Sequence, residues 1–184
     1  KSRPICGPDE LVKTVTDVVK KALICPRNPN HLRKEVAQMR TRIDNKHHTA
    51  SIWEIKHHRG GLVDIEFIVQ YLQILHAHNN PKILTANTKS ALTNLIKSGF
   101  INATDGGKLK NTLALFQAVQ GMLRLTLERM EDNSTVEVLP APLQQVLAKS
   151  RNLENLEQME TSLRTSAAEV FSIYNRIIVE TEKN

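Results

Sequence analysis

The 184-residue chain has few of the residues that build turns and aromatic cores. Seven glycines and seven prolines are few for a fold of many short strands, and aromatic residues make up only 4% of the sequence. Leucine, isoleucine, valine and alanine must therefore fill the core, and such side chains pack well between helices. No apolar run reaches the ~18 residues of a membrane span and no signal peptide is visible, so we expect a cytoplasmic protein without a membrane partner.

The two cysteines and the net charge exclude few possible functions. Cys6 and Cys25 show no ligand spacing, which favours reduced thiols or small buried side chains. The formal net charge of +6 weakly indicates an acidic partner. The only dense basic group alternates with apolar residues at helical spacing and has no aromatic neighbours, so we favour a solvated helix face over a nucleic-acid site. This group comprises Arg27, Arg33, Lys34, Arg40 and Arg42.

Apolar periodicity predicts an all-α, up-and-down bundle of about five to seven helices. The expected helices cover residues 8–24, 30–45, 62–78, 88–98, 104–130, 143–149 and 153–180. The first places Leu11, Val15, Val18, Val19 and Ala22 on one face. We expect residues 1–7 to be a linker or the tail of a preceding domain, and residues 8–182 to form the bundle. A short extended segment at residues 53–55 is expected before the third helix.

The most informative segment is IKHHRGGLVDIEFIVQYLQ, residues 55–73. Gly60 and Gly61 lead directly into a helix that is apolar on nearly all sides, which predicts that this helix lies in the middle of the bundle. A glycine pair at a helix N-terminus can bind a phosphate or form a tight turn. Two acids within the next five residues would repel an anion, so both alternatives remain open, with the turn favoured.

The two acids of this helix, Asp64 and Glu66, are predicted to point to opposite sides. Two residues correspond to a rotation of about 200°, so the pair cannot readily share a metal ion or a proton. We expect Glu66 to turn inward and pair with Arg124, because a buried carboxylate needs a cationic partner. For Asp64 two alternatives remain. Its carboxylate can interact favourably with the positive end of the helix dipole, or it can face outward toward another domain.

No set of residues in the sequence has the spacing of a self-sufficient active site. The seven histidines form no HExxH motif and no cluster with cysteine. A nucleophile elbow, a P-loop and a dinucleotide-binding glycine pattern are also missing. We therefore predict neither a catalytic residue nor a metal site in this chain.

One known family shares the informative segment. The segment resembles the helical domain that follows the nucleotidyltransferase domain in bacterial glutamine synthetase adenylyltransferases, which transfer and remove adenylyl groups. PII uridylyltransferases share the Lys, Gly-Gly and Asp part, whereas the Ile-Glu-Phe continuation favours the adenylyltransferases. The resemblance extends over most of the chain and fits the second of their two catalytic-plus-helical units. The matched residues are Ile55, Lys56, Gly60, Gly61, Asp64, Ile65, Glu66, Phe67 and Gln70 to Leu72.

The resemblance implies a role in regulating nitrogen assimilation, by transfer of AMP from ATP to a tyrosine of glutamine synthetase with Mg²⁺. It places the metal-binding acids on the preceding nucleotidyltransferase domain, so we expect the chain alone to be inactive. The implied partners are that domain, glutamine synthetase and the PII signal protein. The residues implied at the edge of the nucleotide cleft are Lys56, Arg59, Gly60, Gly61, Asp64 and Glu66.

One departure from the family pattern concerns the glycine-rich loop. Family members often have a further glycine where this sequence has His58, so backbone binding of a phosphate is less favoured, although Lys56 and Arg59 can still reach a triphosphate. Two alternatives stay open. One is a non-enzymatic helical adaptor that binds another protein through its basic second helix. The other is a nucleic-acid-binding bundle, which predicts salt-sensitive binding.

Overall fold

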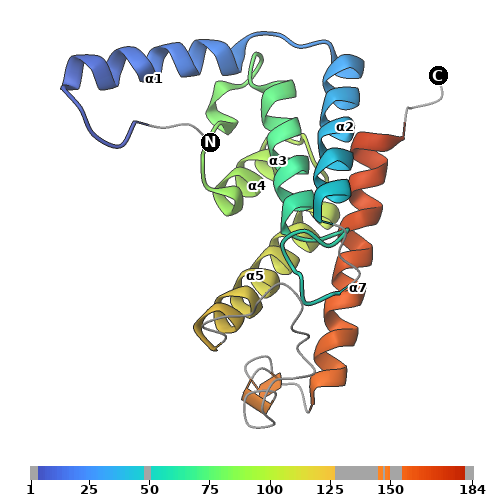
Figure 1. Cartoon of the computed structure of the whole chain (residues 1–184). Helices are drawn as coiled ribbons and strands as arrows, with labels where there is room; N and C mark the ends of the chain where they lie inside the picture. Colours follow the sequence, from blue (N-terminus) through green and yellow to red (C-terminus); the bar gives the residue numbers. More distant parts are fainter. Residues whose placement is uncertain (1–3, 48–50, 127–144, 147, 150–154, 181–184) are drawn as a thin grey trace.

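The predicted all-α bundle is confirmed (Figure 1). The computed structural model describes residues 4–47, 51–126, 145–146, 148–149 and 155–180, and no strand occurs among them. Within these ranges no helix is long and apolar enough to cross a membrane. Of the expected helix at residues 143–149, positions 145–146 and 148–149 are described and are helical, and the other three positions lie outside the described residues. The elements are α1 (Asp9–Ile24), α2 (Pro29–His47), α3 (Leu62–His76), η1 (Pro81–Ile83), α4 (Thr88–Lys97), α5 (Ala103–Thr126), α7 (Leu156–Tyr174) and η3 (Asn175–Val179).

Helix α3 forms the centre of the bundle, as its apolar sequence predicts. Helices α2, α4, α5 and α7 all pack against it (Figure 1). Ile65 and Ile68 are fully buried, and Val69 and Tyr71 are each only 2% exposed. The buried Gln73 donates from Nε2 to the carbonyl oxygens of Ile83 (2.8 Å) and Thr85 (3.1 Å), so α3 also holds the connection to α4.

Asparagine side chains cap the N-terminal ends of α2, α4, α5 and α7. Asn28 accepts a hydrogen bond from the His31 N–H at the start of α2. Asn87 accepts a hydrogen bond from the Ser90 N–H at the start of α4, and Asn155 accepts one from the Gln158 N–H at the start of α7. Asn102 caps α5 by accepting from the Asp105 N–H at 2.8 Å. Asparagine is among the best residues for this position. The 3₁₀ turn η1 was not expected from the sequence.

Helix α1 forms where the sequence predicts it, but none of its side chains is buried. It extends away from the other helices (Figure 1). Most of the apolar face predicted for it lies in solvent, with Leu11 57% and Val18 61% exposed, whereas Val19 is half-buried.

Two adjacent glycines near the start of α5 give a test of helix packing. A Cβ added at Gly107 meets nothing within 4 Å, so Gly107→Ala is expected to raise the free energy of unfolding by about 0.5 kcal/mol. A Cβ added at Gly106 lies 2.4 Å from Cγ1 of Ile96, which must move. Gly106→Ala is therefore expected to leave the free energy of unfolding unchanged or to lower it. Urea unfolding of both variants checks this, and equal gains would contradict the packing of α4 on α5.

Candidate functional site

A buried ion pair joins α2 to the first turn of α3. Arg40 and Asp64 are both 0% exposed, and Nε of Arg40 lies 2.5 Å from Oδ1 of Asp64. An Arg40 terminal nitrogen also donates to Oδ2 of Asp64 at 3.4 Å. Taking both charges out of water is costly, so each depends on the other for its stability in the core.

The inward direction predicted for Glu66 is wrong, and so is the outward position that was one of the two alternatives for Asp64. Asp64 is fully buried instead of facing outward, and Glu66 is only half-buried. Arg124 is exposed, so a buried Glu66–Arg124 pair is excluded. The rotation of about 200° did separate the two acids, but the one that turns inward is Asp64.

The loop before α3 is a tight turn pressed against α7. Gly60 has a φ of +79°, and a Cβ added there would lie 1.9 Å from the carbonyl oxygen of Ala167. A Cβ added at Gly61 would lie 2.4 Å from the carbonyl oxygen of Ile55. The short extended segment expected at residues 53–55 is wrong, since the chain turns there. Of the two alternatives for the glycine pair, the structure shows the turn.

The backbone N–H groups at the start of α3 all have partners within the protein. Gly60 donates to Oδ2 of Asp64 at 2.5 Å, and Gly61 donates to the carbonyl oxygen of His58 at 2.8 Å. The N–H groups of Leu62 and Val63 donate to carbonyl oxygens of the same loop. A phosphate would need these groups to be available. The phosphate alternative is therefore not supported at this helix end.

Arg40 also fixes the loop from the side of α2. One of its terminal nitrogens donates to the carbonyl oxygen of His57 at 3.0 Å, and the other lies 3.5 Å from Oδ1 of Asp44. Asp44 in turn accepts from Nε of Arg59 at 3.1 Å. One line of alternating charges thus runs from Asp64 through Arg40 and Asp44 to Arg59.

The loop presents two permanent cations at the surface. Lys56 is exposed, and the Arg59 side chain is 32% exposed while its guanidinium carbon lies 5.8 Å from the ring centre of Phe171. An arginine placed over an aromatic face is held by a cation–π interaction. Lys56 is therefore free to move through solvent, whereas Arg59 is held in one direction by Asp44 and Phe171.

Two neighbouring groups stay uncharged near neutral pH. Burial raises the pKa of Tyr174 to about 12, and the negative charge of Asp64 adds to this shift. The pKa of His57 is lowered from 6.5, first by burial and then by the positive charges of His47, Lys56 and Arg40. His57 also stacks on His47, with ring centres 3.8 Å apart. Neither Tyr174 nor His57 therefore adds charge to this surface at pH 7.

Sequence reasoning missed Arg40 as the central residue of the site. Arg40 was assigned to a solvated helix face, but its side chain is 0% exposed. The spacing held a usable signal, because Arg40 follows Val36 by four residues and so continues the inward stripe of α2. An arginine on an apolar stripe indicates a buried acidic partner.

The described residues do not form a site for a resident metal ion. No three His, Cys, Asp or Glu side chains in this part of the chain gather closely enough to hold one. Asp64 is occupied by Arg40 and the Gly60 N–H.

The sequence profile of the family described as GlnD PII-uridylyltransferase matches residues 30–178, which include the whole site. The chain belongs to this family. The matched range begins in α2 and ends in η3, so it contains the helices that meet around the Gly60 loop.

Curated relatives with similarity to this GlnD-family chain are bifunctional glutamine synthetase adenylyltransferase/adenylyl-removing enzymes. One from Rhodopseudomonas palustris (strain TIE-1) is 30% identical over 178 residues, and one from Bradyrhizobium diazoefficiens is 26% identical. One from Xanthobacter autotrophicus is 28% identical. The chain aligns over 97% of its own length but spans only 18% of the length of each relative. The resemblance inferred from residues 55–73 is confirmed.

Proposed function

We propose that this chain is the helical domain of a glutamine synthetase adenylyltransferase and supports AMP transfer from ATP to a tyrosine of glutamine synthetase. The names of the relatives support the reaction, and the 18% coverage supports a domain within a larger enzyme. Mg²⁺, the catalytic acids and the ATP site would then belong to a nucleotidyltransferase domain outside these 184 residues. Binding of PII and a cytoplasmic location stay predictions.

The observation that carries the proposal is the rigid support of the loop at residues 56–61. Arg40 and Asp64 hold its backbone from within the core, and Gly60 is pressed on α7. A preorganised cation costs no rearrangement when it meets a polyphosphate, so Arg59, which Asp44 and Phe171 hold, is suited to the rim of a nucleotide cleft. Lys56 adds a second, exposed cation on the same fixed backbone. Gly60, Gly61 and Asp64 shape this rim, and a place for Glu66 at the rim stays a prediction.

The proposal is tested by AMP incorporation into glutamine synthetase, using the long enzyme that contains this domain. Lys56→Ala and Arg59→Ala are each expected to lower kcat/KM for ATP by roughly tenfold, since a hydrogen bond to a charged group contributes ~1.5 kcal/mol. Lys89→Ala, at an exposed position of α4, is the matched control and should change nothing.

An unchanged kcat/KM in both loop variants would contradict the proposed rim. Thermal unfolding of each variant accompanies the assay, because Arg59→Ala also removes the contacts with Asp44 and Phe171. A loss of activity without a change in unfolding temperature supports a direct role of these two cations.

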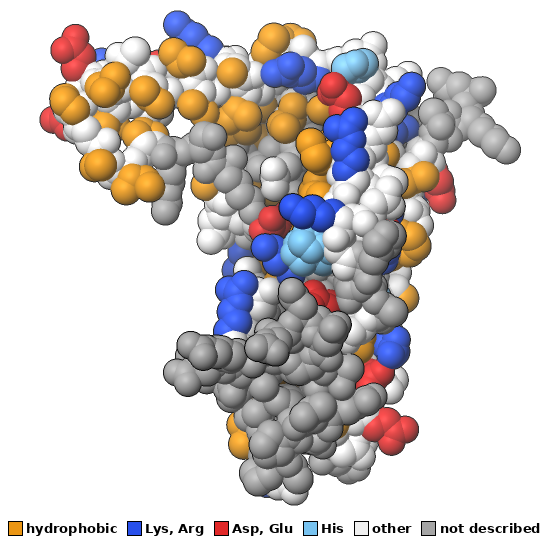
Figure 2. Space-filling model, viewed as in Figure 1, with side chains coloured by type: hydrophobic (Ala, Val, Ile, Leu, Met, Phe, Trp, Pro, Cys, Tyr) orange, Lys and Arg blue, Asp and Glu red, His pale blue; other side chains and the backbone are white. Residues whose placement is uncertain are grey.

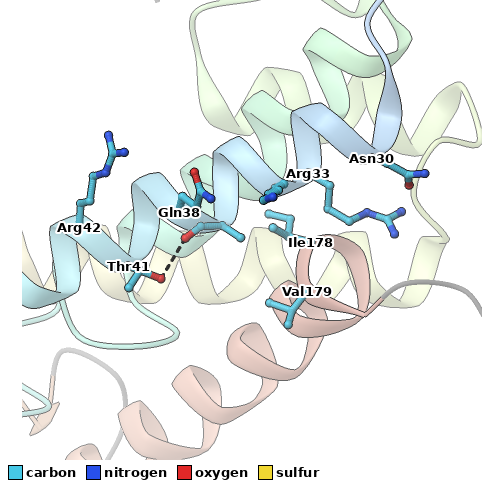
Figure 3. Close-up of a pocket in the computed structure, with 9 residues that line it drawn as sticks. Asn30, Arg33, Gln38, Thr41, Arg42, Ile178 and Val179 are labelled. Atoms are coloured by element: carbon cyan, nitrogen blue, oxygen red, sulfur yellow. Dashed lines mark hydrogen bonds between the residues drawn. The ribbon is translucent and has the colours of Figure 1, made fainter.

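The adaptor alternative is favoured by a groove between α2 and η3, which has a volume of ≈ 600 Å³ (Figure 3). Arg33, Lys34 and Arg42 line it from α2, and the exposed Val179 contributes an apolar side. This basic groove fits an acidic protein segment better than a flat surface would. The adaptor alternative predicts that Lys56→Ala and Arg59→Ala leave AMP transfer unchanged.

A further inference from the structure

Helix α1 carries a continuous apolar stripe that the bundle does not cover. Leu11, Val15, Val18 and Ala22 follow one another at spacings of four and three residues, which places them on one side of the helix. Leu11 is 57%, Val15 40% and Val18 61% exposed, and Ala22 is exposed too. Figure 2 shows hydrophobic side chains along the length of α1. A contiguous apolar surface of this kind marks an interaction site.

The helix lacks the support that a free surface helix needs. It buries no residue, and no side chain caps its start at Pro8. Isolated helices of about this length are marginal in water, and most helix stability in proteins comes from packing of an apolar face. Lys13, Asp17 and Lys20 lie on the opposite side and are exposed, so only the apolar side requires a partner.

We propose that the apolar stripe of α1 is covered by the nucleotidyltransferase domain of the same polypeptide, an inference that rests on the function proposed above. The relatives align with 97% of the chain, so the region of α1 belongs to the shared part, yet this part is only 18% of their length. Most of the polypeptide therefore lies outside these residues. A partner on the same chain acts at millimolar effective concentration, which favours it over a second copy.

The two cysteines of the chain report on both ends of this stripe. Cys6 lies just before α1 and Cys25 just after it, and both thiols are exposed. If a domain covers α1, alkylation of these thiols and exchange of the α1 amide hydrogens should slow together.

The experiment compares amide hydrogen exchange and thiol alkylation, both read by mass spectrometry, in the 184-residue chain and in the long enzyme. Exchange of the amides of residues 11–22 is expected to be at least about tenfold slower in the long enzyme. Leu11→Asp and Val18→Asp should remove this protection. Lys13→Asp, on the opposite side of the same helix, should retain it and serves as the matched control.

Equal exchange in the two proteins would overturn the proposed docking surface. Protection that appears in the 184-residue chain and grows with its concentration, together with a dimeric mass, would overturn it in favour of a second copy. This test and the test of the proposed function can fail independently. If α1 is unprotected in the long enzyme but Lys56→Ala lowers AMP transfer, only the docking surface is refuted. Protected α1 with fully active Lys56→Ala and Arg59→Ala variants refutes only the proposed rim.

Discussion

Gly60→Ala is expected to lower the free energy of unfolding by at least about 3 kcal/mol. The φ of +79° alone costs a residue with a Cβ about 1–2 kcal/mol. The larger effect comes from the 1.9 Å approach of that Cβ to the carbonyl oxygen of Ala167. Both groups belong to backbone, so a side-chain rotation cannot relieve the overlap and α7 must move. Urea unfolding at neutral pH measures the loss.

Gly99→Ala is the matched control for this prediction. Gly99 also has a positive φ, +72°, but a Cβ added there meets nothing within 4 Å. Its replacement is expected to cost only the backbone strain of about 1–2 kcal/mol. Similar losses in the two variants would show that the loop is not pressed against α7.

Arg40→Ala is expected to cost about 3–5 kcal/mol of unfolding free energy. The truncation leaves the fully buried Asp64 carboxylate without its cation, and it removes a guanidinium that supports the His57 carbonyl oxygen. Arg40 is also one of the largest fully buried side chains, so its loss opens a cavity. Chemical denaturation followed by circular dichroism measures the change.

Arg42→Ala provides the comparison on the same helix. Arg42 is exposed and lines the groove between α2 and η3, so its truncation is expected to change stability by no more than about 0.5 kcal/mol. A small loss of unfolding free energy in both arginine variants would show that the ion pair does not hold α2 on α3.

The position of α3 was predictable because a helix that is apolar on nearly all sides must be surrounded by other helices. The start of α3 at Leu62 was predictable from the glycine pair, because the tight turn at Gly60 and Gly61 prevents the helix from beginning earlier. The directions of Asp64 and Glu66 were not predictable in the same way. Periodicity fixes the angle between two side chains, but the rotation of the whole helix is set by its neighbours.

Periodicity also could not show that α1 lies outside the bundle or that Arg40 of α2 is buried. Periodicity identified the apolar face of α1, but it carries no information on whether a partner lies within the chain. On α2, a count of basic residues grouped Arg40 with Arg33 and Arg42, although burial separates them. The buried pair depends on an acid 24 residues away, and local spacing does not report contacts at that distance.

The central claim is that Asp64 is a structural partner of Arg40 and holds the loop that presents Lys56 and Arg59. The most direct test is a double-mutant cycle with Arg40→Ala, Asp64→Ala and the double variant, each measured by urea unfolding. A coupling free energy of about 2–3 kcal/mol is predicted. The double variant should therefore lose much less unfolding free energy than the sum of the losses in the two single variants. Losses that add within about 0.5 kcal/mol would contradict the claim.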